Sequence, residues 1–159
     1  DVLERKVLQS SVTVHWADDA ESTTVTVPST VTGYLLQFLA TLVPTLLIEG
    51  ALLLLFRYSW KKNWEAFLLV NVLTQGFLAV ASVYVTAHSG VSAWYLFFFL
   101  LPAELIILLV ELYLYAGCGL LTGHSKGRAA AYAITANLAS AVLGYYLAEP
   151  VWRLVVSIL

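Results

Sequence analysis

Two glutamates lie inside one long apolar run, and their type and spacing suit them to chemistry within a membrane. Glu104 and Glu111 fall in a run that extends from about Trp94 to Ala116. They are seven residues apart, about two helical turns, so both side chains leave the same face of a helix. A carboxyl group inside a membrane helix is costly unless it meets a partner, an ion or water. The two acids therefore predict an intramembrane polar site.

Polar side chains recur at a similar depth in the other apolar runs. Asn71 and Gln75 are four residues apart, and Asn137 and Ser140 are three apart, so each pair shares one helix face. Glu49 lies near the end of the first run. Counted from the helix ends, these groups fall in one layer between one membrane surface and the midplane. The candidate ligand-binding residues are Glu49, Asn71, Gln75, Glu104, Glu111, Asn137 and Ser140.

This candidate set contains carboxyl, amide and hydroxyl groups and no basic side chain. Ionised carboxylates would repel one another in a low dielectric, so some are protonated, or a cation lies among them, or water fills the site. Oxygen ligands suit a hard cation such as Na⁺, Ca²⁺ or Mg²⁺, or an ammonium group. The candidates for holding a metal are Glu49, Glu104 and Glu111, and no other cofactor is predicted. The structural alternative is that these groups only join helices through hydrogen bonds.

The sequence offers little other catalytic chemistry. It has one cysteine, Cys118, which excludes an internal disulfide and a Cys-rich metal site. No HExxH motif, Ser-His-Asp pattern, Cys-His pair or phosphate-binding loop is evident. The sequence therefore favours a non-catalytic protein. A membrane enzyme that uses a Glu as general base on a lipid is the least favoured alternative.

The composition indicates an integral membrane protein. Of the 159 residues, 60% are hydrophobic and only 11% are charged, whereas a soluble domain is nearer half apolar and a quarter charged. The excess is concentrated in long runs, so the lipid bilayer is the expected environment. A net charge of −2 indicates no nucleic-acid partner.

We expect an all-α membrane protein, a bundle of four transmembrane helices with a small extracytoplasmic β-hairpin. Residues 1–30 hold five of the ten acids and alternate apolar with polar residues around a polar turn, which predicts the hairpin. Residues 149–159 are too short to span and form an interfacial tail or begin a further span. The predicted spans of the transmembrane domain 34–147 are 34–56, 64–86, 94–116 and 129–147.

The basic residues predict the orientation. Loops 57–63 and 117–128 contain Lys and Arg, whereas the loop between the second and third spans contains neither. The positive-inside rule then makes both basic loops cytoplasmic and both termini extracytoplasmic, in the cell membrane. The sequence also lacks methionine, even at position 1, which we interpret as removal of a signal peptide.

Four short segments in this order resemble a family of small bacterial integral membrane proteins. They are Leu46–Gly50, Leu69–Gln75, Glu104–Glu111 and Ala136–Ser140. We associate the family with Gram-positive bacteria, and its members carry an extracytoplasmic N-terminal segment followed by about four helices. The family is uncharacterised, so the resemblance, which covers about residues 34–147, implies topology and no activity.

Two functions compete on these grounds. In the first, the protein binds or transports a cation or a proton-coupled small solute through the carboxyl and amide groups, with access from the cytoplasm. In the second, it is an accessory or assembly subunit whose polar layer is structural and whose hairpin contacts a partner. A second copy of the chain or another membrane subunit would be that partner.

Overall fold

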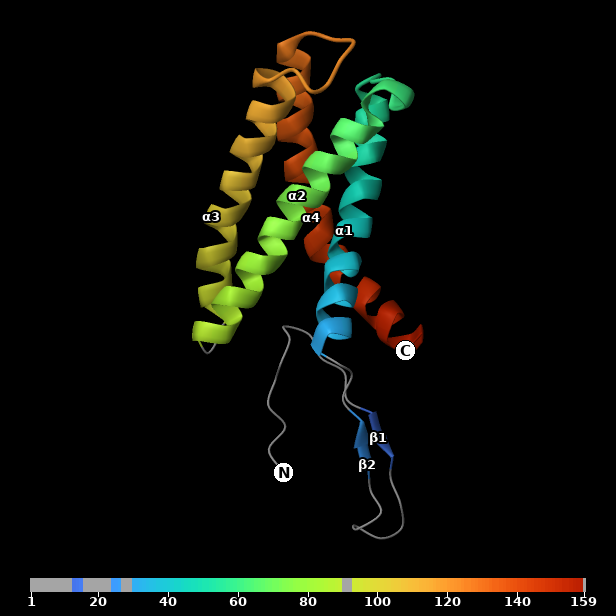
Figure 1. The fold of residues 1–159 in the computed structure, drawn as a ribbon, viewed down its shortest axis with the longest axis vertical. Coiled ribbons are helices and arrows are strands. Elements are labelled where there is room, and N and C mark those ends of the chain that lie inside the picture. Colours follow the sequence, from blue (N-terminus) through green and yellow to red (C-terminus); the bar gives the residue numbers. More distant parts are fainter. Residues whose placement is uncertain (1–12, 16–23, 27–29, 90–92, 159) are drawn as a thin grey trace.

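The protein is a bundle of long helices. The computed structural model describes residues 13–15, 24–26, 30–89 and 93–158 (Figure 1). A π-helical segment, Tyr113–Gly117, continues the third helix without a break. The α-helices of the described ranges are α1 (Thr30–Leu55), α2 (Trp60–Ser89), α3 (Ala93–Leu112) and α4 (Lys126–Ile158).

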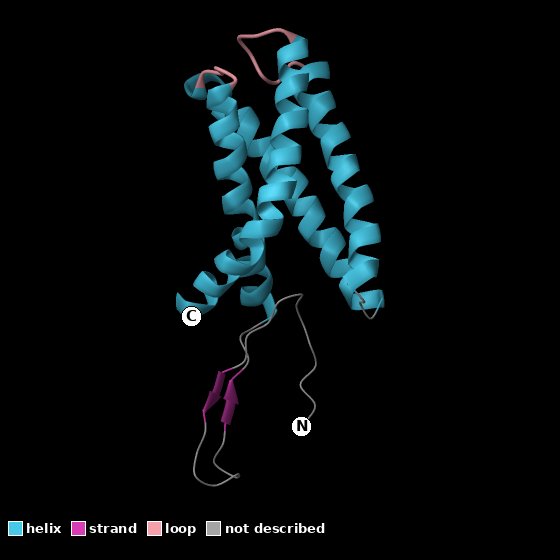
Figure 2. Cartoon of the chain, turned by 180° about the vertical axis from the view of Figure 1, so that it is seen from behind, coloured by secondary structure: helices cyan, strands magenta, loops and turns pink. Residues whose placement is uncertain are grey.

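The helices pack in a closed ring. In chain order α1 packs against α2, α2 against α3 and α3 against α4, and α4 returns to α1 in the most extensive contact (Figures 1 and 2). The connections at the top of Figure 1, residues 56–59 and 118–125, lie together at one end of the bundle. We call this the basic end, because it carries Arg57, Lys61, Lys62, Lys126 and Arg128. The opposite end holds the start of α1 and the ends of α2 and α4 (Figure 1).

The outer surface of the bundle is apolar. Large hydrophobic side chains such as Leu47, Leu73 and Leu109 are more than half exposed. Such a surface would be unfavourable in water, whereas lipid tails accommodate it. By length and composition, three helical segments could cross a membrane: Val31–Leu55, Trp60–Val85 and Lys126–Leu147. The chain is therefore a helical membrane protein.

The chain turns sharply after α1 because Arg57 adopts a left-handed conformation, with φ of 63°. The backbone N–H of Arg57 donates to Leu54 O (2.8 Å) and that of Tyr58 to Leu53 O (3.1 Å), which closes the helix in a Schellman motif. This turn directs Tyr58 into the core, where it is 3% exposed. Glycine usually occupies such a position, so Arg57 bears a local conformational cost.

The C-terminal part of the chain differs from our expectation. We expected the fourth span to end near residue 147 and residues 149–159 to form an interfacial tail or to begin a further span, but one helix, α4, continues to Ile158. Pro150 lies inside this helix. A proline removes only one backbone hydrogen bond, so a helix can run through it with a bend instead of ending. Figure 1 shows the last part of α4 leaving the bundle near the start of α1.

Two short strands precede the helices. β1 (Thr13–His15) and β2 (Thr24–Thr26) pair antiparallel, with Val14 opposite Val25. The expected turn of the hairpin and most of residues 1–30 fall outside the described residues. The extracytoplasmic hairpin therefore stays a prediction.

A cluster of buried hydrophobic residues lies near the basic end. Three tyrosines meet there: the ring centroids of Tyr115 and Tyr132 are 5.7 Å apart, and those of Tyr58 and Tyr132 are 6.0 Å apart. Leu53 and Phe67 complete the contacts, and both are 2% exposed or less. Since aromatic side chains bury large areas, this cluster anchors all four helices at that end.

Candidate functional site

Glu111 accepts a hydrogen bond on each of its two carboxyl oxygens. It lies at the end of α3 and is 1% exposed. Its Oε1 accepts a hydrogen bond from the Thr74 hydroxyl of α2 at 2.9 Å, and its Oε2 accepts one from Asn137 Nδ2 of α4 at 2.7 Å. The carboxyl group of Glu111 thereby joins three helices.

Glu49 of α1 is equally buried but only half satisfied. Its side chain is 1% exposed. Its Oε1 accepts a hydrogen bond from the Ser140 hydroxyl of α4 at 2.9 Å. Its Oε2 is buried without a hydrogen-bond partner. A buried oxygen of this kind is energetically costly unless a proton, an ion or a water molecule satisfies it.

Asn71 of α2 has a second unsatisfied oxygen. The side chain is fully buried, and its Nδ2 donates to Phe67 O (3.1 Å) and to the Tyr115 hydroxyl (3.4 Å). Its Oδ1 has no hydrogen-bond partner. The amide lies near enough to Glu49 to interact electrostatically with that carboxyl group. Two incompletely satisfied polar groups thus lie together in the interior.

The buried acids also influence each other. Glu49 interacts electrostatically with Glu111, and more weakly with Glu104. Within the described ranges, no Lys, Arg or His forms an ion pair with either Glu49 or Glu111. Because like charges repel strongly at low dielectric, the site is stable only if a proton or a cation reduces the negative charge.

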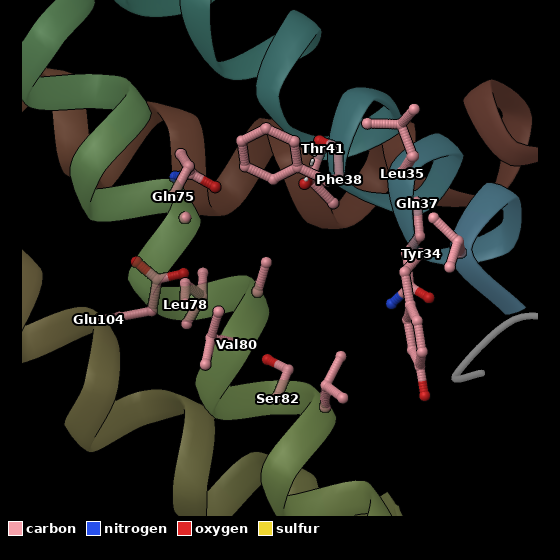
Figure 3. A pocket seen from close by; sticks show the side chains of 14 residues that line it. Tyr34, Leu35, Gln37, Phe38, Thr41, Gln75, Leu78, Val80, Ser82 and Glu104 are labelled. Carbon is pink, nitrogen blue, oxygen red and sulfur yellow. Dashed lines mark hydrogen bonds between the residues drawn. The ribbon is translucent and has the colours of Figure 1, made fainter. Parts of the chain in front are cut away.

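Glu104 and Gln75 lie apart from this central group. They line a groove between α1 and α2 with a volume of about 750 Å³, and both side chains are half-buried (Figure 3). Glu104 precedes Glu111 by seven residues, about 10 Å along the helix axis at 1.5 Å per residue. Because of this separation, Glu104 and Glu111 have different neighbours although they lie on the same face of the helix.

The structure therefore divides the seven candidate residues into two sets. Among the described residues, no three His, Cys, Asp or Glu side chains are grouped so that they could hold a metal ion. The expected grouping of Glu49, Glu104 and Glu111 around one ion is thus not observed. The central site comprises Glu49, Asn71, Glu111, Asn137 and Ser140, and the groove holds Gln75 and Glu104.

The expected access from the cytoplasm stays a prediction, and the structure shows what lies between the central site and the basic end. The tyrosine cluster lies beside the central site at that end, and the Tyr132 hydroxyl donates to the backbone carbonyl of Glu49 at 3.3 Å. Tyr115 and Tyr132 are both fully buried. Burial raises the pKa of the Tyr58 hydroxyl, an effect that the nearby Arg128 opposes. Buried aromatic side chains thus adjoin the central site on the side of the basic end.

Several contributing residues were missing from our candidate set. Thr74 and Tyr115 bond directly to candidate residues, and each follows one of them at helical spacing, which was the available signal. On α1, four polar residues follow one another at intervals of four and so share one helix face: Gln37, Thr41, Thr45 and Glu49. Thr41 and Gln37 line the groove, and Thr45 is 8% exposed. This row of residues joins the two sets of polar residues along one helix.

Comparison of the chain with protein-family models, with curated proteins and with solved structures found no match. The fold and the central site define the class instead: a small helical membrane protein with two buried carboxyl groups at the junction of its helices.

Proposed function

We propose that the protein binds a proton or a hard cation at the central site, and that it transports that ion or couples it to a small solute. The supporting observation is the Glu49 Oε2 atom, which is buried without a partner while a second carboxyl group, Glu111, interacts with Glu49. A proton on Oε2 would turn this acceptor into a donor, and a cation would neutralise it. Either event reduces the repulsion between the two acids.

The transmembrane arrangement is part of the proposal. α3 has 20 residues, about 30 Å at 1.5 Å per residue, and runs beside α2 between the two ends of the bundle (Figure 1). We therefore treat it as a fourth span. The positive-inside rule supports a cytoplasmic basic end in the cell membrane, and hence an extracytoplasmic N-terminus. The resemblance to small membrane proteins of Gram-positive bacteria fits this topology.

The binding of an ion is testable through stability. A ligand that binds only the folded state raises the melting temperature by mass action. We expect acidification, or one of Na⁺, K⁺, Ca²⁺ and Mg²⁺, to raise the melting temperature of the purified protein by about 2 °C or more. Glu49→Gln keeps the shape of the side chain and should abolish that shift.

Glu65→Gln is the matched control, because Glu65 is exposed near the start of α2. This variant should retain the full shift. The proposal fails if no condition changes the melting temperature, or if Glu49→Gln responds as the wild type does.

A structural role is the second candidate, favoured by the bonds of Glu111. Its carboxyl group accepts one hydrogen bond from α2 and one from α4, which would suit an accessory or assembly subunit whose polar layer only joins helices. In that case Glu49→Gln would lower the melting temperature by the same amount at every pH and in every salt.

A further inference from the structure

The groove between α1 and α2 is a cavity that the central site does not occupy. It opens between the first half of α1 and the second half of α2, away from the basic end (Figure 3). Its volume of about 750 Å³ lies within the range of small-molecule sites in proteins. The space is therefore large enough for an organic ligand.

The lining of the groove combines apolar walls with few polar groups. Leu35, Phe38 and Tyr34 of α1 face Leu78 and Val80 of α2 across the groove (Figure 3). The polar groups include Gln37, whose Oε1 is buried without a hydrogen-bond partner. Apolar walls with a small number of placed polar groups are typical of sites that bind organic molecules.

The lining of the groove contains a carboxyl group and no basic side chain. Glu104 is the one ionisable acid among the described lining residues, and these residues include no Lys, Arg or His. Its carboxyl group lies near Gln75 at the α3 side of the groove (Figure 3). A carboxylate among apolar side chains is unfavourable unless a positive charge approaches it. The Phe38 ring, which Figure 3 shows on the Gln75 side of the groove, would also interact favourably with a cation.

We propose that this groove binds an amphipathic organic cation. Its positive charge lies at Glu104 and Gln75, and its apolar part lies against α1 and α2. This assignment names a solute class for the proposed function and rests on that function for transport. Binding itself depends on Glu104 and not on Glu49. A lipid tail is the competing occupant, and it offers no positive charge for the carboxyl group.

Binding can be measured with tetraphenylphosphonium, a lipophilic cation without hydrogen-bond donors. The protein is placed in phosphatidylcholine nanodiscs, and bound cation is measured by equilibrium dialysis against empty nanodiscs. We expect saturable binding that Glu104→Gln weakens roughly ten- to hundredfold, the effect of losing one interaction with a charged group. Glu104→Asp retains the charge and should bind more tightly than Glu104→Gln.

Two further measurements test the site and its chemistry. Ala79→Trp fills the groove without changing its charge and should also abolish binding, while Glu65→Gln should bind as the wild type does. The neutral triphenylphosphine oxide should not compete. Glu49→Gln should still bind tetraphenylphosphonium, so a failure of the central ion site is distinguished from a failure of the groove.

The proposal is overturned if no saturable binding occurs, or if binding survives both Glu104→Gln and Ala79→Trp. It is equally overturned if the neutral compound competes as well as the cation, since an apolar molecule or lipid tail would then be the occupant.

Discussion

At the scale of single residues, the two buried acids differ in how well they are satisfied. Glu111 accepts hydrogen bonds on both oxygens, whereas Glu49 accepts one on Oε1 and none on Oε2. The side chain with the unsatisfied oxygen is the better candidate for exchanging a proton or an ion, because a change of occupancy there breaks no existing bond. Glu111 is better suited to holding the helices in place around it.

The bonds of Glu111 make a testable contribution to stability. Asn137→Ala removes the 2.7 Å hydrogen bond to Oε2 and leaves a buried carboxyl oxygen without a partner. We expect the free energy of unfolding to fall by about 0.5–2 kcal/mol, the usual range for interhelical hydrogen bonds in membranes. Unfolding in mixed micelles with increasing SDS measures this change.

Leu138→Ala serves as the comparison for that measurement. Leu138 is the next residue of α4, and its side chain is 58% exposed on the outer surface. Its truncation should change the free energy of unfolding less than Asn137→Ala does. An equal or larger loss for Leu138→Ala would show that the Asn137 bond contributes little.

At the scale of elements, Asn63 fastens the two connections at the basic end. It lies in the first turn of α2, which begins at Trp60, and its side chain is fully buried. Its Oδ1 accepts the Thr122 backbone N–H at 2.7 Å, and its Nδ2 donates to Thr122 O at 3.3 Å and Ser59 O at 3.0 Å. One amide thus holds the α1–α2 connection to the loop before α4.

Hydrogen exchange can detect this link directly. Asn63→Ala removes the acceptor of the Thr122 amide proton, so we expect that amide to exchange faster by roughly tenfold, as loss of about 1.4 kcal/mol of local stability would cause. Asn63→Asp retains an acceptor oxygen and should protect the amide better. Equal exchange in the two variants would contradict this role of Asn63.

The sequence predicted the helices better than it predicted the contacts between them. Long apolar runs identify helices by length, and polar residues at spacings of three, four and seven share a face. The runs are apolar on nearly all sides, however, so their periodicity does not indicate which face points inward. Asn71 and Asn137 joined the central site, whereas Gln75 and Glu104 line the groove, because that division depends on how each helix is rotated against its neighbours.

At the scale of the whole molecule, the two ends of the bundle are unlike. The basic end holds the buried cluster of Tyr58, Tyr115 and Tyr132 and the Asn63 link, while the groove opens between α1 and α2 toward the other end. Our expectation of access from the basic end relied on the depth of the polar layer alone, and it stays a prediction. Depth gives the distance of a group from each surface, whereas the packing of neighbouring side chains determines how far that group is buried.

The proposed orientation predicts which end is accessible from the cytoplasm. Cys118 is exposed at the basic end, so in intact cells it should not react with a membrane-impermeant maleimide and in inside-out vesicles it should. A Cys118→Ser, Ser89→Cys variant places the thiol at the other end of α2 and should give the reverse pattern. Labelling of Cys118 in intact cells would require the opposite orientation.

The π-helical segment Tyr113–Gly117 has a consequence for how the chain length can vary. The N–H of Cys118, which follows the segment, donates to Tyr113 O at 2.8 Å. The acceptor lies five residues back instead of four, so this turn holds one residue more than an α-helical turn. Deleting one of the two residues of this segment that precede Tyr115 would restore α-helical geometry. Glu111 would not move, because it precedes the segment. Tyr115 would no longer reach Asn71 in the same way. A related protein that is one residue shorter at this point would keep the carboxyl site and lose part of its tyrosine cluster.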